Sequence, residues 1–232
     1  MDFGRAFTYV TEDPDWIKKI GIAGLITLIP LVGSIILLGW GLEITRRVIN
    51  NNATPLADWD DFGAYLLSGV KGFIAVVVYC LPIGVIYGCG IGLTFGLAGA
   101  AGSVDSEASG ALGSIAGASI FCIYCFVILY AIFIALVIPP AFANLAVTGE
   151  LGAAFRFGEI FSILRAAVGP YLLSLLVLAL ASSVLSSIGS LLCGIGLLFT
   201  SAYTLAVSSH LHGQAYNIAK ATTGGAAIEQ SM

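Results

Sequence analysis

Charged side chains are scarce in this sequence. Only 9% of its 232 residues are Asp, Glu, Lys or Arg, whereas 59% are hydrophobic, and the mean hydropathy is +1.02. Soluble domains carry roughly 25% charged residues, so this composition excludes an ordinary soluble domain and indicates a polytopic membrane protein. The sequence also lacks a basic patch, and its formal net charge is -4. We therefore expect the lipid bilayer as a partner, and no nucleic acid.

The cysteines lack polar surroundings. All five fall inside apolar stretches, where a disulfide framework of the secreted kind has no reason to form. They are Cys80, Cys89, Cys122, Cys125 and Cys193. Cys122 and Cys125 make a C-x-x-C pair, but an apolar environment disfavours the thiolates that a redox or metal site requires. We treat the pair as small buried hydrophobic residues and expect no metal and no cofactor there.

The amino-terminal segment "MDFGRAFTYVTEDPDWIKK" lacks the short basic region of a cleavable signal peptide, so we expect it to remain in the mature protein. The remainder of the chain is organised by four runs without charge. They cover residues 20–42, 72–104, 108–149 and 166–219. Each run is long enough for at least one span of about 20 residues, and the last two are long enough for more.

The first run contains "LIPLVGS", with Pro30 and Gly33 at its centre. As one kinked helix the run fits a bilayer. As a hairpin, residues 16–29 and 34–49 are about 21 and 24 Å long, which is short against a hydrocarbon core of about 30 Å. Charge placement favours the hairpin, because a turn at Pro30 and Gly33 leaves all nine Lys and Arg residues on the cytoplasmic side.

The predicted fold class is therefore all-α, a single membrane domain over 1–232 with about six transmembrane helices arranged as three hairpins. The first hairpin either spans or is re-entrant. The spans lie near residues 16–30, 34–49, 70–98, 114–146, 166–186 and 190–216. The expected location is a membrane, with multiple passes and both termini in the cytoplasm.

Short amphipathic helices are predicted in the cytoplasmic interface near residues 2–12, 60–70 and 150–164. In the first, Phe3, Phe7 and Val10 oppose a polar side. The similar strings "DFGRAF", "DFGAYL" and "RFGEIF" begin the three segments and suggest three related units. The acidic residues beside these segments suit helix capping, with Asp13 before a first helical Pro14 and with Asp58, Asp60 and Asp61 before the next helix.

Glu43 follows a long apolar run and precedes Arg46 and Arg47, which places all three side chains on one helix face. An intramembrane carboxylate suggests a proton or cation site. Near a helix end, however, Glu43 can pair with both arginines, so we predict an interfacial ion pair.

Small residues form a stripe in the third span at Gly84, Gly88, Gly92 and Gly96, each four positions from the next. The stripe predicts close helix packing, either against Gly113 and Gly117 or against a neighbouring subunit. A glycine-lined path for a solute is the alternative.

His210 and His212 are weak candidates for cofactor binding, since either imidazole alone could ligate a haem-like ring. We favour a histidine hydrogen-bonded to a nearby group at the interface. Pro139 and Pro140 are expected to end or kink the fourth span.

The string "DFGRAFTYVTEDPDWIKKIGIAGLITLIPLVGSIILLGWGLEITRRVIN", with the following "PLADWDDFG", resembles the opening of the prokaryotic membrane proteins catalogued as domain of unknown function 4013. The likeness is specific over roughly residues 1–75 and compositional after that. The resemblance implies a location in a prokaryotic plasma membrane and a helical architecture, and it assigns no catalytic residue.

The sequence therefore predicts a non-catalytic accessory or scaffold subunit that organises a membrane complex or the local bilayer and binds other membrane subunits or itself. The alternative is a small transporter or channel. Convergence of Glu43, Asn144 and the break at Pro139 on one wet cavity would favour that alternative.

Overall fold

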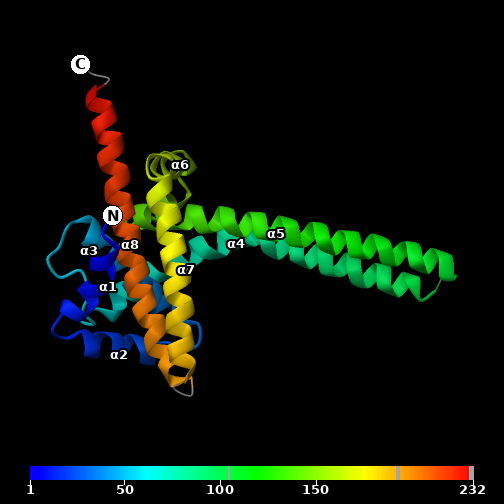
Figure 1. Ribbon diagram of the computed structural model, residues 1–232, viewed down its shortest axis with the longest axis horizontal. Coiled ribbons are helices and arrows are strands. Elements are labelled where there is room, and N and C mark those ends of the chain that lie inside the picture. Colours follow the sequence, from blue (N-terminus) through cyan, green and yellow to red (C-terminus); the bar gives the residue numbers. More distant parts are fainter. Residues whose placement is uncertain (104, 192–193, 230–232) are drawn as a thin grey trace. The chain divides into compact units, whose positions relative to one another are not determined.

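The computed structural model is all-α over the residues that it describes, 1–103, 105–191 and 194–229, with side chains described through 223 (Figure 1). Cys193 lies outside these residues. The chain forms two compact units, one of Met1–Ala75 and Leu136–Met232 and the other of Val76–Ala135. The helices are α1 (Phe3–Glu12), α2 (Trp16–Ile26), α3 (Val32–Ile49), α4 (Phe62–Ala101), α5 (Ser106–Thr148), the 3₁₀ helix η1 (Leu151–Phe155), α6 (Phe157–Ala166), α7 (Val168–Leu191) and α8 (Ile195–Glu229).

The chain turns between α2 and α3 at the Pro-Gly pair of the first apolar run. Leu31 has φ +60, and the Gly33 amide donates to the Ile29 carbonyl oxygen at 3.0 Å. A Cβ on Gly33 would lie 2.0 Å from the Ile26 carbonyl oxygen, so the tight turn requires glycine there. Pro30 is exposed at the tip. The two arms pack against each other as a helical hairpin.

α8 is the central helix of the first unit. It packs against α1, α2, α3, α6 and α7, and the pair of α7 and α8 is seen side by side in Figure 1. Glycine allows the close approaches: a Cβ on Gly213 would lie 2.7 Å from Val48 Cγ1, and one on Gly41 would lie 2.9 Å from Ser209 Oγ. The two contacts hold α3 against α8, because small residues let helix backbones approach closely.

α3 and the first turns of α4 meet at two further glycines. A Cβ on Gly39 would lie 1.9 Å from the Tyr65 carbonyl oxygen, and a Cβ on Gly69 would lie 1.9 Å from the Ile35 carbonyl oxygen. Each glycine therefore faces the backbone of the other helix. This reciprocal contact fixes the crossing point of α3 and α4 within the first unit.

The apolar side of α1 is covered by protein. Ala6 and Val10 are fully buried, and Phe3 and Phe7 pack with Val207 and Leu211 of α8. The side that the amphipathic pattern assigns to the bilayer interface thus contacts the chain itself. The pattern identified an apolar face correctly, but periodicity alone does not say whether lipid or another helix covers it.

Of the predicted segment 60–70, residues 62–70 are the first turns of α4 and do not form a separate helix. Asp61 caps α4 as the sequence predicts, since its Oδ1 accepts the Ala64 amide at 2.9 Å. α5 continues through Pro139 and Pro140, so these two residues do not end it.

The second unit, Val76–Ala135, contains the carboxyl-terminal part of α4 and the amino-terminal part of α5. Tyr130 Oη donates to the Tyr79 carbonyl oxygen at 3.0 Å, and Gly90 packs against Ile123. Most of its large hydrophobic side chains are exposed, which leaves long apolar surfaces on both helices. Three helices of the described chain, α4, α5 and α7, are long and apolar enough to cross a membrane.

Candidate functional site

Six charged side chains of the first unit form one connected ion-pair network. Its members come from the turn between α1 and α2, the start of α2, the end of α3 and the loop between α3 and α4. They are Asp13, Lys19, Glu43, Arg46, Arg47 and Asp58. The three carboxylates and three cations balance in formal charge.

Lys19 is at the buried end of this network and is only 7% exposed. Its Nζ lies 2.6 Å from Asp13 Oδ2 and 2.8 Å from Asp58 Oδ1, and it also donates to the Leu56 carbonyl oxygen at 3.2 Å. An unpaired buried ammonium would be costly, so these three acceptors are what make the burial of Lys19 tolerable.

Glu43 is at the other end, where the structure brings it together with both arginines. Glu43 Oε2 lies 3.0 Å from Arg46 Nε, and Glu43 Oε1 lies 3.2 Å from Arg47 Nε. Arg47 also reaches Asp58 Oδ2 at 3.6 Å and the Leu56 carbonyl oxygen at 3.3 Å. The Glu43 carboxylate thus has two cationic partners.

Two tryptophans fasten the loop between α3 and α4 to this network. Trp40 Nε1 donates to the Ala57 carbonyl oxygen at 3.0 Å, and Trp59 Nε1 donates to the Lys19 carbonyl oxygen at 2.9 Å. The two indole rings stack at 5.2 Å. Tyr65 adds a hydrogen bond from its hydroxyl to the Asp58 carbonyl oxygen. The polar atom of each buried indole is hydrogen-bonded, so the loop is attached to α3 through Trp40 and to α2 through Trp59.

The network changes the acidity of Asp58, which lies in the loop. The hydrogen bond from Lys19 holds the pKa of the Asp58 carboxyl below its ordinary value, and the positive charges of Lys19 and Arg47 act in the same direction. Asp58 is therefore ionised throughout the neutral range. Its environment does not suit a general acid or base, which needs a pKa close to the working pH.

Asp13 Oδ1 accepts the Asp15 amide at 2.9 Å, which is the hydrogen bond expected of a capping side chain ahead of Pro14, although α2 itself begins two residues later, at Trp16. Oδ2 of the same carboxylate binds the Lys19 ammonium, which is buried and requires a carboxylate partner. Sequence reasoning treated Asp13, Lys19 and Asp58 separately, although all three stand in or beside the strings that carry the family resemblance.

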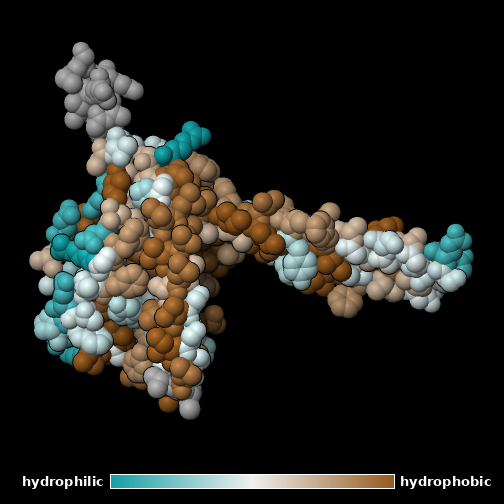
Figure 2. Space-filling model, in the orientation of Figure 1, coloured by the Kyte–Doolittle hydropathy of each residue, from teal (hydrophilic) through white to brown (hydrophobic). Residues whose placement is uncertain are grey.

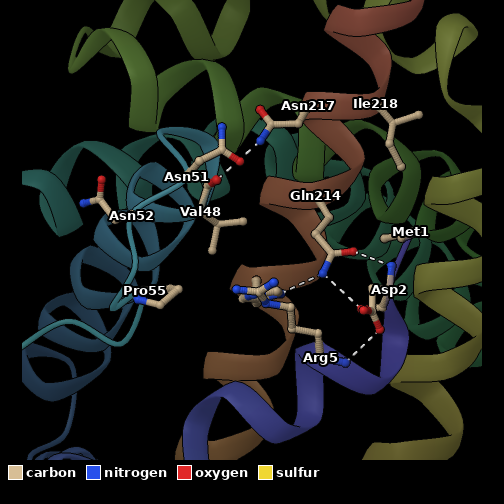
Figure 3. A pocket seen from close by; sticks show the side chains of 11 residues that line it. Met1, Asp2, Arg5, Val48, Asn51, Asn52, Pro55, Gln214, Asn217 and Ile218 are labelled. Atoms are coloured by element: carbon tan, nitrogen blue, oxygen red, sulfur yellow. Dashed lines mark hydrogen bonds between the residues drawn. The ribbon is translucent and has the colours of Figure 1, made fainter. Parts of the chain in front are cut away.

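A second polar feature of the first unit is an open pocket of about 540 Å³, which we call the amino-terminal pocket. It lies between the start of α1, the loop after α3, and α8 (Figure 3). Its lining residues are Met1, Asp2, Arg5, Val48, Asn51, Asn52, Pro55, His210, Gln214, Asn217 and Ile218. The walls thus combine polar groups from three segments that are far apart in the sequence.

The two histidines of α8 have different surroundings. His210 is 4% exposed, stacks on the Tyr9 ring at 4.3 Å and is hydrogen-bonded through Nδ1 to Gln214 Nε2 at 3.1 Å. His212 is half-buried on the same helix and does not line the amino-terminal pocket. The structure does not bring the two imidazoles to one site.

The four glycines of the α4 stripe contact no other part of the described chain. No described atom lies within 4 Å of the position that a Cβ would take at Gly84, Gly88, Gly92 or Gly96, and the same holds for Gly113 and Gly117. Packing of the stripe on the two α5 glycines within the chain is therefore wrong, because the contact between α4 and α5 runs through Gly90 instead. Packing against a neighbouring subunit stays a prediction.

The cysteine pair of α5 is on the surface of the second unit. Cys122 and Cys125 are exposed free thiols, as are Cys80 and Cys89. The expectation that the pair is buried is wrong for the chain by itself, since the described residues leave both thiols exposed. Over the described ranges, no group of three or more His, Cys, Asp or Glu side chains is placed to hold a metal ion.

Asn144 and Glu43 do not share a cavity. Two cavities of about 180 and 300 Å³ lie beside Glu43, and neither Asn144 nor Pro139 is among the residues that line them. Asn144 is buried in α5, and its Nδ2 has no hydrogen-bond partner in the described part of the chain. The convergence that would favour a transport site is therefore not found at these two cavities.

Over the described residues the fold is all-α, with three helices long and apolar enough to cross a membrane and with a loop between α3 and α4 that carries Asp58 and Trp59. The chain belongs to the family described as protein of unknown function (DUF4013), whose sequence profile matches residues 22–194. The match confirms the resemblance and extends it well beyond residue 75, whereas the Asp-Pro-Asp-Trp start precedes it. No curated protein and no solved structure matches the chain.

Proposed function

We propose that this protein is a non-catalytic integral membrane protein, an accessory or scaffold subunit that organises a membrane complex or the local bilayer. The partners are other membrane subunits or further copies of the chain. The exposed surface of α4 and α5 in the second unit is where these partners pack. The ion-pair network serves to fix the loop and the first hairpin in place.

The observation that carries this proposal is the open glycine stripe of α4. Lipid chains are as apolar as leucine side chains, so an apolar surface alone does not require a protein partner. Four glycines in line are different, because they let a second helix backbone approach closely and gain dispersion contacts. Within the described chain nothing occupies this surface, which leaves room for a helix from another subunit.

A small transporter or channel is less well supported. Coupling of a proton or cation requires an ionisable group that can change its partner inside the membrane. Glu43 is held by Arg46 and Arg47, and the cavities beside it do not include Asn144. The charges of the network are paired with one another and leave no carboxylate free for a cation.

For the topology, we propose three hairpins, α2 with α3, α4 with α5, and α7 with α8, in a prokaryotic plasma membrane. α2 has 11 residues, so at 1.5 Å per residue it is about 16 Å long, against about 30 Å for the hydrocarbon core. The first hairpin is therefore re-entrant in this proposal. Both termini and all nine basic residues are then cytoplasmic.

The test compares assembly with flux. Gly88→Leu and Gly92→Leu add bulk to the stripe, and Ala98→Leu adds similar bulk to an exposed position of α4 that is not a member of the stripe. In mild-detergent purification from native membranes, we expect the two glycine variants to lose the associated subunits and Ala98→Leu to retain them. All three should keep the thermal stability of the isolated chain.

Reconstituted vesicles provide the opposing outcome. A proton- or cation-dependent flux through wild-type vesicles that disappears in Glu43→Gln, together with unchanged assembly of the glycine variants, would refute the scaffold proposal and favour a transporter. We expect Glu43→Gln to leave both assembly and vesicle permeability close to those of the wild type.

A further inference from the structure

We propose that the amino-terminal pocket binds a singly charged oxyanion, a phosphodiester group, through Arg5 and His210. The pocket volume of about 540 Å³ is within the range of roughly 300–1,000 Å³ that is usual for small-molecule sites. The pocket belongs to the first unit alone and does not involve the surface of α4 and α5. The inference is therefore independent of the scaffold proposal.

The hydrogen bonds of Gln214 determine where the proton of His210 resides. The Asp2 amide donates to Gln214 Oε1 at 2.8 Å, and because a backbone amide only donates, this contact identifies the oxygen of the Gln214 side chain. Gln214 Nε2 then donates one hydrogen to the Asp2 carbonyl oxygen at 3.0 Å and the other to His210 Nδ1 at 3.1 Å. Nδ1 is thus an acceptor, and the proton of the neutral imidazole is on Nε2.

His210 therefore presents a fixed donor on the pocket wall. The residue is only 4% exposed, and its ring is held by the stack on Tyr9 and the bond to Gln214. Within the described residues, the Nε2–H group has no acceptor. Because the imidazole lines the open pocket, a ligand oxygen can accept a hydrogen bond from this donor.

Arg5 supplies the charge. Its amide is bonded to Asp2 Oδ1 at 2.9 Å, but its guanidinium has no hydrogen bond or ion pair with any described residue. The Arg5 side chain leaves α1 in the direction away from the Asp2 carboxylate, as Figure 3 shows. A guanidinium presents a planar fork of donors that matches the paired oxygens of a phosphodiester.

The remaining lining sets the charge and size of the ligand. Asp2 is the one carboxylate among the lining residues, and with Arg5 it leaves the side chains of the wall close to neutral, which favours a singly charged anion over a dianion. Asn51 and Asn52 offer further amide donors. Val48, Pro55 and Ile218 provide apolar surface for the organic part of the ligand.

A phosphodiester of this kind is present in phospholipid headgroups and in soluble glycerophosphodiesters, and the experiment separates the two sources. The full chain in detergent is titrated calorimetrically with glycerophosphoglycerol at constant ionic strength, with glycerol as the uncharged control. In parallel, phosphatidylglycerol is added and the complex is counted by native mass spectrometry. Binding in only one arm identifies the source, and binding in both arms shows that the headgroup alone is recognised.

The variants decide whether the binding uses this pocket. Arg5→Gln should weaken binding about tenfold to hundredfold, the effect of losing a charged hydrogen bond. His210→Phe keeps a ring to stack on Tyr9 but removes the Nε2–H donor, and should also weaken it. Asp2→Asn retains a residue that can cap α1 while removing the opposing charge, so it should tighten binding. Arg156→Gln, an exposed arginine on another segment, is the matched control and should bind as the wild type does.

Absence of binding in both arms for the wild-type chain would overturn the inference. So would binding that Arg5→Gln and Arg156→Gln weaken equally, since this would indicate nonspecific attraction to positive charge. The Arg5 side chain has no partner in the described structure, so Arg5→Gln is expected to fold, and its result stands even where His210→Phe is unstable.

Discussion

Replacement of Gly39 by Ala is the sharpest test of how the first unit packs. The added Cβ would lie 1.9 Å from the Tyr65 carbonyl oxygen, 2.7 Å from the Tyr65 carbonyl carbon and 2.8 Å from Ser68 Oγ. Two of these atoms belong to the backbone of α4, which does not move aside as the end of a side chain does. α3 and α4 must therefore separate at their crossing, with loss of the contacts around it.

The expected magnitude is that of overpacking, which typically costs about 1–3 kcal/mol. For a chain of this size each kcal/mol lowers the melting temperature by about 2–4 °C, so Gly39→Ala should lower it by about 2–12 °C. The measurement is thermal unfolding in detergent, followed by size-exclusion chromatography. Gly84→Ala is the matched control on α4, where no described atom lies within 4 Å of the new Cβ. Alanine favours a helix over glycine by about 1 kcal/mol, so the control should be neutral or stabilising.

Gly69→Ala extends the test to the other side of the crossing, since its Cβ would lie 1.9 Å from the Ile35 carbonyl oxygen. The first substitution already separates the helices, so the second should cost less in its presence. The shift for Gly39→Ala with Gly69→Ala should be smaller than the sum of the single shifts. Equal stability of Gly39→Ala and Gly84→Ala would refute the close approach of α3 and α4.

Three further outcomes are expected. Lys19 lowers the pKa of Asp58, so the ionised Asp58 carboxylate contributes stability that is complete above the unfolded pKa of about 3.9 and is lost as the pH falls through the lower folded pKa. Acid unfolding of Asp58→Asn should therefore depend less steeply on pH than that of the wild type. An unchanged pH profile would contradict the ion pair. Single cysteines at Asp105 and Asn51, in a background without native cysteines, should react with an impermeant reagent from opposite sides, Asp105 outside; labelling of both from outside would overturn the proposed topology. Replacement of Cys122 and Cys125 by Ser should leave metal content and melting temperature unchanged, and loss of a stoichiometric metal would show that the pair is a site.

The hydrophilic and hydrophobic parts of the first unit reflect its composition directly. Figure 2 shows hydrophilic residues over α1 and the loop between α3 and α4, and hydrophobic residues along α7. The charge-free runs predicted the apolar helices because a charged residue is costly in the bilayer. The turn at Pro30 and Gly33 could be predicted from the sequence because its cause is local. Proline restricts the backbone angles and glycine permits unusual ones, whatever surrounds them. The pairing of Glu43 with Arg46 and Arg47 could also be predicted from local sequence, because side chains three and four residues apart are neighbours on any helix.

Contacts between distant segments were decided only by the tertiary structure. In a chain that is 59% hydrophobic, the period of 3.6 residues identifies which glycines share a face, but it does not distinguish Gly39 and Gly69, which meet a backbone, from Gly84 and Gly88, which meet none. The partnership of Lys19 with Asp58 joins two different segments and depends on the loop folding back over α2. The amino-terminal pocket joins Arg5 to His210 across almost the whole chain, because α1 packs along α8 and places their polar groups together.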